Sequence, residues 1–157
     1  MSEMHWPTVR EIYAQGIATR NATFETLLPE WTEWDARHLA YCRLVALRDA
    51  EVVGWAALSG VSSRQVYRGV AEVSVYVAAD AQGQGIGSAL LAALITESER
   101  NGIWTLQAGI LCENAASIHL HEKAGFRIVG RRERIGQLDG QWRNTVLMER
   151  RSKIVGV

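Results

Sequence analysis

The chain has 157 residues, of which 48% are hydrophobic and 22% are charged. This composition excludes a disordered protein and provides enough chain to bury a substantial core, so we expect one globular domain over residues 1–157. Lysine plus arginine and aspartate plus glutamate both number 17, so the formal net charge is zero. No overall field favours nucleic acid or an anionic membrane, and we expect neither as a partner.

The same sequence bears on location and on metal binding. No apolar run approaches the length of a membrane span, and the first residues lack the regions of a signal peptide, so we expect a cytoplasmic location. Cys42 and Cys112 are too few for a disulfide framework and belong to no zinc-binding pattern. His119 and His121 would point to nearly opposite sides of a helix. We therefore expect no metal.

Hydrophobic periodicity predicts helices and strands along the whole chain. In order, we expect a helix at 9–17, a helix at 34–41, a hairpin of strands 44–47 and 52–58, a strand at 70–77, a helix at 88–100, a strand at 104–110, a short helix at 115–124, and a hairpin of strands 126–135 and 142–148. Proline, glycine and serine never cluster enough to mark a linker, and no internal repeat is present.

A glycine-rich stretch, Gln82-Gly83-Gln84-Gly85-Ile86-Gly87, joins the strand at 70–77 to the helix at 88–100. Glycines at such a passage let several N–H groups and the positive end of the helix converge on one point, which makes an anion site. A P-loop would need a lysine after Gly87, and a dinucleotide fingerprint needs other glycine spacing directly after its strand. A plain glycine-rich surface turn stays open as the alternative at this point.

Two motifs resemble the GCN5-related N-acetyltransferase (GNAT) superfamily. Gln82, Gly85 and Gly87 fit Gln-x-x-Gly-x-Gly, the pyrophosphate-binding loop of that family, and Glu113–Phe126 is similar to its late Asn…Ala-x-x-Leu-x-Glu-Lys-x-Gly-Phe segment. The resemblance implies an α/β fold with a mixed central sheet flanked by helices, and acetyl-CoA as co-substrate. Family members usually begin with a short strand. Few residues precede Pro7, so that strand is expected to be truncated or absent.

Within the superfamily, the chain is similar to the phosphinothricin and methionine sulfoximine N-acetyltransferases. The likeness lies in Tyr67–Val77, in Leu120-His121-Glu122, in Ala22–Glu25 and in Gly140–Trp142. It implies acetyl transfer to the α-amine of a small amino acid or analogue, by direct attack in a ternary complex. It also implies a homodimer with acceptor sites near the subunit boundary. Two alternatives stay open: acetylation of protein N-termini or polyamines, and a non-catalytic acyl-CoA-binding sensor.

Two residues are candidates for acid–base chemistry. Glu72 places a carboxylate in the strand 70–77, on one face with Ser74 and Tyr76. Periodicity alone fits a charge on a solvated strand face equally well, whereas the resemblance implies a base that acts on the substrate ammonium directly or through water. His121 stands where many relatives carry a tyrosine that acts as the acid, and its imidazolium could protonate the departing thiolate or assist with the amine. A merely structural histidine is the alternative, and which residue is the principal acid–base group stays open.

The acetyl-CoA site that the resemblance implies combines a strand end, the glycine loop and a short helix. It comprises Val75, Tyr76, Val77, Gln82, Gly83, Gln84, Gly85, Ile86, Gly87, Ser88, Asn114 and Ser117. In the family, a backbone N–H of the strand before the loop stabilises the oxyanion, which here places the donor near Val75 or Val77. Asn114 would contact the pantetheine arm, unless it serves only as the N-cap of the short helix.

Substrate recognition is expected from Phe24, Arg64, Tyr67 and Arg68. A guanidinium forms a two-point fork with a carboxylate, so an arginine is the natural anchor for an amino acid. Arg68 is the leading candidate because it precedes the strand of Glu72, and Arg64 and Arg143 are the others. A solvated surface charge is the alternative for each. Five arginines near the C-terminus are expected to be exposed strand and tail charges: Arg131, Arg132, Arg134, Arg150 and Arg151.

Overall fold

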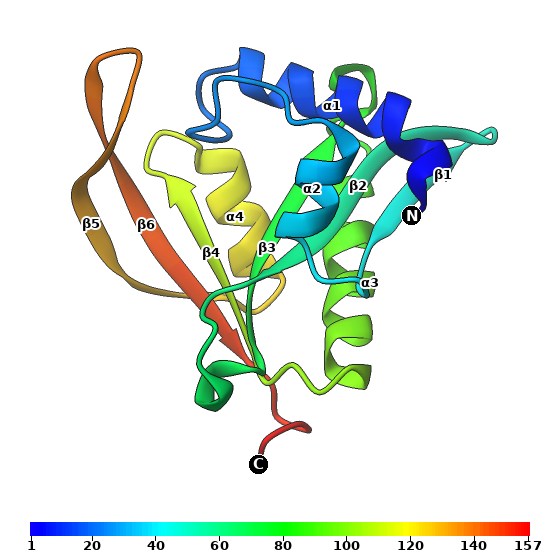
Figure 1. Cartoon of the computed structure of the whole chain (residues 1–157). Coiled ribbons are helices and arrows are strands. Elements are labelled where there is room, and N and C mark those ends of the chain that lie inside the picture. The colour runs from blue at the N-terminus through cyan, green and yellow to red at the C-terminus, as the bar shows by residue number, and fades with distance from the viewer.

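The computed structural model describes residues 1–157 and contains one six-stranded sheet with helices on both faces (Figure 1). The helices are α1 (Trp6–Ala18), α2 (Trp31–Arg37), α3 (Ile86–Arg100) and α4 (Ala115–Lys123). The strands are β1 (Leu44–Arg48), β2 (Glu51–Gly60), β3 (Val70–Val77), β4 (Thr105–Leu111), β5 (Arg127–Leu138) and β6 (Gln141–Arg151). Three short 3-10 helices are η1 (Glu3–His5), η2 (Gln65–Tyr67) and η3 (Ala79–Ala81).

The sheet is mixed, with the strand order β1-β2-β3-β4-β6-β5. β3 and β4 run parallel, and every other neighbouring pair is antiparallel. This arrangement confirms the mixed, helix-flanked sheet that we expected. The segment before α1 forms η1 and no strand, and Pro7 lies in the first turn of α1, where its missing N–H is harmless.

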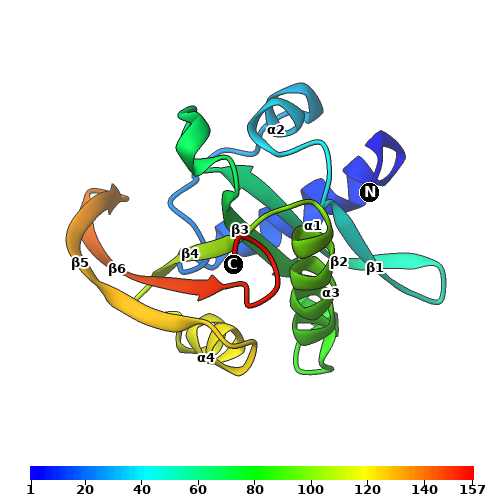
Figure 2. The same ribbon diagram turned by 90° about the horizontal axis from the view of Figure 1, so that it is seen from below.

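Each face of the sheet buries its own apolar cluster. α3 and α4 cover one face (Figure 2), and the buried residues of α3 recur on one stripe: Leu90, Leu91, Leu94, Ile95 and Ser98. α1 and α2 cover the other face, where an aromatic cluster joins the helices to the sheet. Its members are Trp6, Tyr13, Trp31, Trp34, Trp55 and Tyr76, with neighbouring ring centroids 4.8 to 5.7 Å apart.

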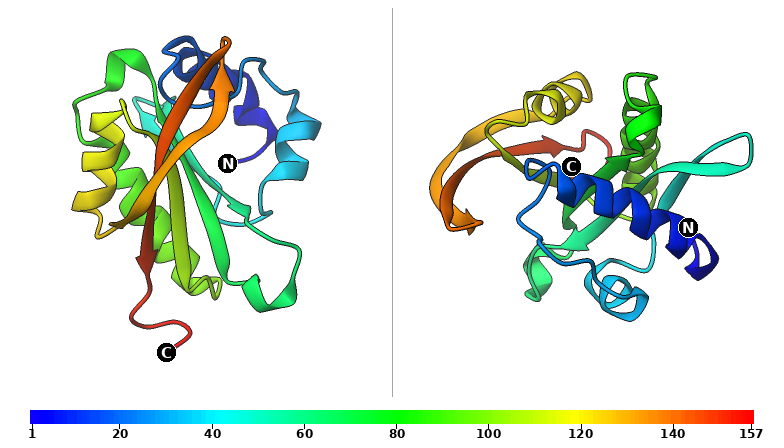
Figure 3. Two further views of the ribbon diagram at one scale, coloured as in Figure 1. Left: turned by 90° about the vertical axis from the view of Figure 1, so that its left-hand side faces the viewer. Right: turned by 90° about the horizontal axis from the view of Figure 1, so that it is seen from above.

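Both predicted hairpins are present, and each has a tight turn with left-handed residues. Asp49 and Ala50 (φ 50° and 68°) connect β1 to β2, and Asp139 and Gly140 (φ 50° and 77°) connect β5 to β6. Two consecutive residues with positive φ give a turn whose twist matches that of the strands. The free end of the β5–β6 hairpin curls toward the face that carries α1 (Figure 3).

One helix differs from its predicted position. α2 covers Trp31–Arg37, whereas its apolar spacing predicted a helix at 34–41. Its start is stabilised by the Glu33 carboxylate, which accepts a hydrogen bond from the Glu30 N–H at 3.3 Å. Its end is set by His38, which is extended (φ −111°, ψ 149°), while the ring nitrogen Nδ1 lies 2.7 Å from the Trp34 carbonyl. These local hydrogen bonds outweigh the apolar spacing.

Candidate active site

A cavity of about 980 Å³ lies where β3 and β4 separate. The two strands pair only where Val70–Glu72 of β3 lies beside Thr105–Gln107 of β4, and beyond these residues they diverge. The cavity is lined by β3, β4, α4, the glycine loop and the connection between α1 and α2. The gap in the sheet therefore brings together segments that are far apart in the sequence.

The diverging part of β3 has main-chain groups without a strand partner. The Ala78 N–H donates to the Val53 carbonyl at 2.9 Å, and such bonds recur at every second residue of an antiparallel ladder. Val75 and Val77 consequently turn their N–H groups away from β2, toward the gap. The Val77 carbonyl faces the same way and is 3.5 Å from the side-chain amide of Gln82. β3 thus offers N–H donors to a carbonyl oxygen bound in the cavity.

The glycine loop presents the open end of α3 to the same cavity. Gly83 and Gly85 have φ values of +74° and +81°, and Gly85 is the N-cap of α3 without a capping side chain. The first internal bond of the helix runs from Ala89 N–H to the Gly85 carbonyl at 3.0 Å. The N–H groups before Ala89 therefore lack helical acceptors and, together with the helix dipole, form a site for an anion.

All but one of the predicted loop residues line the cavity: Gln82, Gly83, Gly85, Ile86, Gly87 and Ser88. Gln84 is the exception. Its amide donates to the Asp80 carbonyl at 3.2 Å, and its oxygen accepts a hydrogen bond from Arg48 at 3.4 Å. Arg48 also forms an ion pair with Asp80 at 3.0 Å. Gln84 therefore stabilises the loop from the side that faces away from the cavity.

Glu72 lies half-buried at the point where β3 and β4 separate. One carboxylate oxygen accepts a hydrogen bond from the amide of Gln107 at 2.9 Å, and Gln107 is the register partner of Glu72 on β4. The other oxygen accepts no hydrogen bond from the chain, and Glu72 lines the cavity. A carboxylate held by one oxygen and free at the other can accept a proton from a bound ammonium.

His121 is a buried residue of α4. It lines the cavity together with Ser117 and Leu120 of the same helix. Its Nδ1 lies 2.8 Å from the Ser117 carbonyl, which can only accept, so Nδ1 carries the proton. Burial lowers the pKa of His121, and the bond to Ser117 opposes that effect only in part. The buried Nε2 has no partner. The structure favours a neutral ring over the imidazolium that the sequence suggested.

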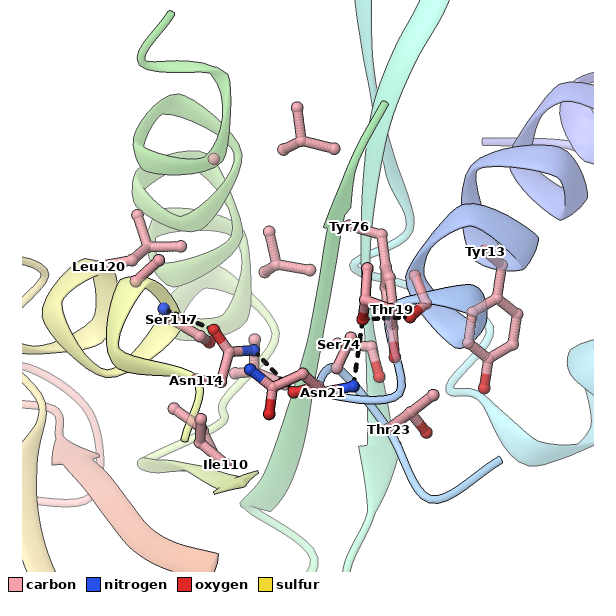
Figure 4. Close-up of a pocket in the computed structure, with 18 of the residues that line it drawn as sticks. Tyr13, Thr19, Asn21, Thr23, Ser74, Tyr76, Ile110, Asn114, Ser117 and Leu120 are labelled. Atoms are coloured by element: carbon pink, nitrogen blue, oxygen red, sulfur yellow. Dashed lines mark hydrogen bonds between the residues drawn. The ribbon is translucent and has the colours of Figure 1, made fainter. Parts of the chain in front are cut away.

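Asn114 connects α4 to the α1–α2 connection (Figure 4). Its side-chain oxygen accepts a hydrogen bond from the Ser117 N–H at 3.1 Å, so it is the N-cap of α4. Its side-chain amide donates to the Asn21 carbonyl, also at 3.1 Å. Both Asn114 and Ser117 line the cavity, so the capping role and the predicted cofactor contact are compatible.

Arg143 stabilises the same connection rather than offering a free guanidinium. It donates to the Arg20 carbonyl at 3.0 Å and to the Asn21 side chain at 3.2 Å, and it forms an ion pair with Glu113 at 3.2 Å. The hydrogen bond from Arg143 lowers the pKa of Glu113. With these partners, Arg143 is poorly available as an anchor for substrate.

The predicted substrate residues fall into two groups. Phe24 lines the cavity, and its ring contacts Gly136 of β5. Arg64, Tyr67 and Arg68 lie around η2 and are exposed outside the cavity of this single chain. The Arg64 guanidinium stacks over the Tyr67 ring at 5.5 Å, and that of Arg68 lies 5.2 Å from the ring of Trp104.

Several cavity residues were not identified from the sequence. Tyr13 belongs to the apolar stripe of α1 and reads as core, yet it lines the cavity beside Tyr76, with ring centroids 4.9 Å apart (Figure 4). Burial raises the pKa of both phenols, so both are protonated at neutral pH. Thr23 and Thr145 also line the cavity. No spacing in the sequence relates Tyr13, Thr23 or Thr145 to Glu72.

Two further observations concern metals and membranes. No group of three or more His, Cys, Asp or Glu side chains is placed to hold a metal ion. None of the helices combines the length and the apolar character needed to span a bilayer.

Known proteins resemble this chain in sequence. The model of the Acetyltransferase (GNAT) family matches residues 6–126. Phosphinothricin N-acetyltransferase of Alcaligenes faecalis is 39% identical over 153 residues, which cover 92% of this chain and 76% of that protein. L-methionine sulfoximine/L-methionine sulfone acetyltransferase of Pseudomonas paraeruginosa is 34% identical over 149 residues, covering 91% and 87%.

Solved structures resemble the chain along nearly its whole length. A phosphinothricin acetyltransferase from Sinorhizobium meliloti, solved in complex with AcCoA, has a TM-score of 0.90 and 30% identity, with 99% of this chain and 88% of that chain covered. Ribosomal-protein-alanine N-acetyltransferase from Brucella melitensis has a TM-score of 0.89 and 34% identity, with 97% of both chains covered.

Proposed function

Since the chain belongs to the GNAT family and is an acetyl-CoA-dependent N-acetyltransferase, we propose that its acceptor is the α-amine of a small amino acid or analogue. Phosphinothricin, methionine sulfoximine and methionine sulfone are the model acceptors. The family and its fold agree with the two sequence motifs. One observation carries the proposal: a single cavity reaches from the glycine loop to Glu72. We further propose that residues 1–157 act as one catalytic domain, in a cytoplasmic homodimer.

The proposed binding mode follows the lining of the cavity. The pyrophosphate of acetyl-CoA would occupy the anion site at the start of α3, where no helical acceptor competes for the N–H groups. The thioester carbonyl would accept a hydrogen bond from the N–H of Val75 or Val77 in the gap between β3 and β4. Asn114 and Ser117 would contact the pantetheine arm of acetyl-CoA, between the anion site and the N–H donors of β3.

The proposed reaction is a direct transfer without an acyl-enzyme. Glu72 takes a proton from the acceptor ammonium, directly or through water, and the freed amine attacks the thioester carbon. The N–H donors of β3 stabilise the negative oxygen of the tetrahedral intermediate. The C–S bond then breaks and the sulfur leaves as a thiolate. The attacking nitrogen gives up its second proton, and the thiolate takes up a proton, directly or through water. His121 is the second acid–base candidate, and its neutral ring suits the role of acceptor better than that of donor.

The α1–α2 connection favours a small acceptor over a protein terminus or a polyamine. Asn114 and Arg143 tie this connection to α4 and β6, and Phe24 packs on Gly136. The acceptor side is therefore bounded by chain rather than open to a long substrate. The similarity to a ribosomal-protein-alanine N-acetyltransferase keeps a protein terminus as the second candidate. A sensor without activity would need no carboxylate at Glu72.

Thiol release from acetyl-CoA tests the proposal. The assay compares phosphinothricin, methionine sulfoximine, methionine sulfone and common amino acids with an alanine-initiated peptide and with spermidine. We expect turnover with one or more of the small α-amino acids and little with the peptide or spermidine. Turnover with only the peptide or the polyamine would replace the acceptor class, and acetyl-CoA binding without turnover on any acceptor would favour the sensor.

A further inference from the structure

Arg132 brings a second charge close to Glu72. Its Nη2 atom lies 2.9 Å from the position that a Cβ atom would take on Gly109 of β4. The Oε1 atom of Glu72, which accepts no hydrogen bond, lies 3.8 Å from the same position. Arg132 itself has no hydrogen-bond or ion-pair partner in the chain. An unpaired guanidinium and a free carboxylate oxygen therefore face one small space above Gly109.

The backbone of β5 directs Arg132 to this place. Consecutive strand residues point to opposite faces, so Arg131 and Arg132 diverge, and Arg131 is close enough to Glu113 to help lower its pKa after the larger effect of Arg143. The register of β5 with β6 shifts directly after Arg132, and Arg134 has a φ of 49°. A bulge of this kind bends a strand and redirects its side chains.

A second cavity, of about 400 Å³, contains Arg132 and adjoins the main one. The two cavities share Phe24, Glu72, Gly109 and Thr145 in their linings. Thr145 is 4% exposed, and its buried hydroxyl has no hydrogen-bond partner. A buried hydroxyl without a partner is costly unless a ligand or water supplies one. The wall of this space thus carries a positive charge and an unused hydrogen-bonding group.

We propose that Arg132, assisted by Thr145, binds the α-carboxylate of the acceptor and so selects amino acids over simple amines. This inference rests on the proposed function. The ammonium and the carboxylate of an α-amino acid are separated by one carbon, so an amine held at Glu72 places its carboxylate close by. The guanidinium forms a two-point fork with that carboxylate, and the Thr145 hydroxyl donates to it. The anchor is then Arg132 and not Arg68, which lies outside the cavity.

Gly109 explains why the guanidinium can lie there. Any side chain on Gly109 would meet Arg132 Nη2 at a distance that a real Cβ contact does not allow. Gly109→Ala should therefore displace the guanidinium without removing its charge. Gly109→Ala is therefore a second test variant. If binding of the carboxylate depends on the position of the guanidinium and not on its charge alone, Gly109→Ala must raise the acceptor KM as substitution of Arg132 does.

The test compares Arg132→Gln with a matched control, Arg131→Gln, which removes an adjacent charge on the opposite face of β5. The acceptors are methionine sulfone and 3-(methylsulfonyl)propylamine, which is the same molecule without its carboxylate. For Arg132→Gln we expect the KM of methionine sulfone to rise about 10- to 100-fold, as for a lost charge-assisted hydrogen bond. The KM of the amine and that of acetyl-CoA should stay unchanged. Gly109→Ala should show the same selective loss, and Arg131→Gln should show none.

Equal losses on both acceptors, or an unchanged KM for methionine sulfone, would overturn the inference. Calorimetric binding of methionine sulfone and of the amine, in the presence of CoA, separates this inference from the proposed function. Binding that depends on Arg132 without turnover would leave the subsite standing and refute the function. Absence of both binding and turnover for methionine sulfone would refute both.

Discussion

Gly85 has a left-handed conformation, and we therefore predict that Gly85→Ala weakens the binding of acetyl-CoA. Gly85 precedes α3 with φ +81° and ψ 0°, and a Cβ atom there would meet nothing within 4 Å. Gly85→Ala is thus sterically possible, but an L-residue in this region costs about 1–2 kcal/mol. The free loop can relieve that strain by leaving the left-handed region, which redirects the N–H groups at the start of α3. Binding must restore the original conformation, so the Kd of acetyl-CoA should rise about 5- to 30-fold.

Gly102 provides the matched control. It follows the other end of α3 with φ +77°, and a Cβ there would likewise meet nothing within 4 Å. Gly102→Ala therefore introduces the same backbone strain away from the cavity. Calorimetric titration with acetyl-CoA should show a wild-type Kd for this variant, while its Tm falls by roughly 2–8 °C. A wild-type Kd for folded Gly85→Ala, or equal weakening by both variants, would refute the assignment of the anion site to this loop.

Three further predictions address the base, the buried histidines and the assembly. Glu72→Gln should lower kcat by about 10² to 10⁴ while leaving the Kd of acetyl-CoA unchanged, and activity should recover partly at high pH, where more acceptor amine is unprotonated; normal turnover at neutral pH would move the base to His121. Burial lowers the pKa of His38 and His121, so the unfolded chain binds more protons below the ordinary value of about 6.5. The free energy of unfolding should therefore be highest above that pH and should decrease as the pH falls below it. The Tm of His121→Gln should depend less on pH between 7 and 5 than the Tm of the wild type. Equal dependence of the two Tm values on pH would contradict this. Light scattering at micromolar concentration should give twice the chain mass of 17.4 kDa, and a monomer mass would overturn the predicted homodimer.

Elements with strong periodicity could be predicted from the sequence. Alternation in Val70–Val77 and a single buried stripe in Ile86–Arg100 correspond to elements whose packing follows directly from their own residues. The glycine loop was also predictable, because its conformation needs glycine at particular positions. α2 was misplaced because its ends depend on the side chains of Glu33 and His38, which compete with apolar spacing.

The acceptor side of the cavity could be predicted only in part. Glu72 was a candidate because a carboxylate interrupts an apolar strand and because its position matches the family resemblance; its role as the base stays a prediction. Its contact with Gln107 depends on the register of β3 and β4, which no local pattern encodes. Arg132 is an exposed strand residue, as the sequence predicted. Its approach to Glu72 could not be predicted, because that approach needs both a bulge in β5 and a glycine on another strand. Contacts that require two independent backbone features leave no signature in spacing.

The aromatic cluster beneath α1 and α2 gives the chain an internal optical reporter. The chain has six tryptophans, and four of them belong to this cluster: Trp6, Trp31, Trp34 and Trp55. The Trp55 ring stacks on Tyr76 at 4.8 Å, and Tyr76 forms part of the cavity wall. A molecule that enters the acceptor side therefore changes the surroundings of the ring against which a buried indole is stacked. We therefore expect intrinsic fluorescence to report occupancy of the cavity, without a label and without turnover.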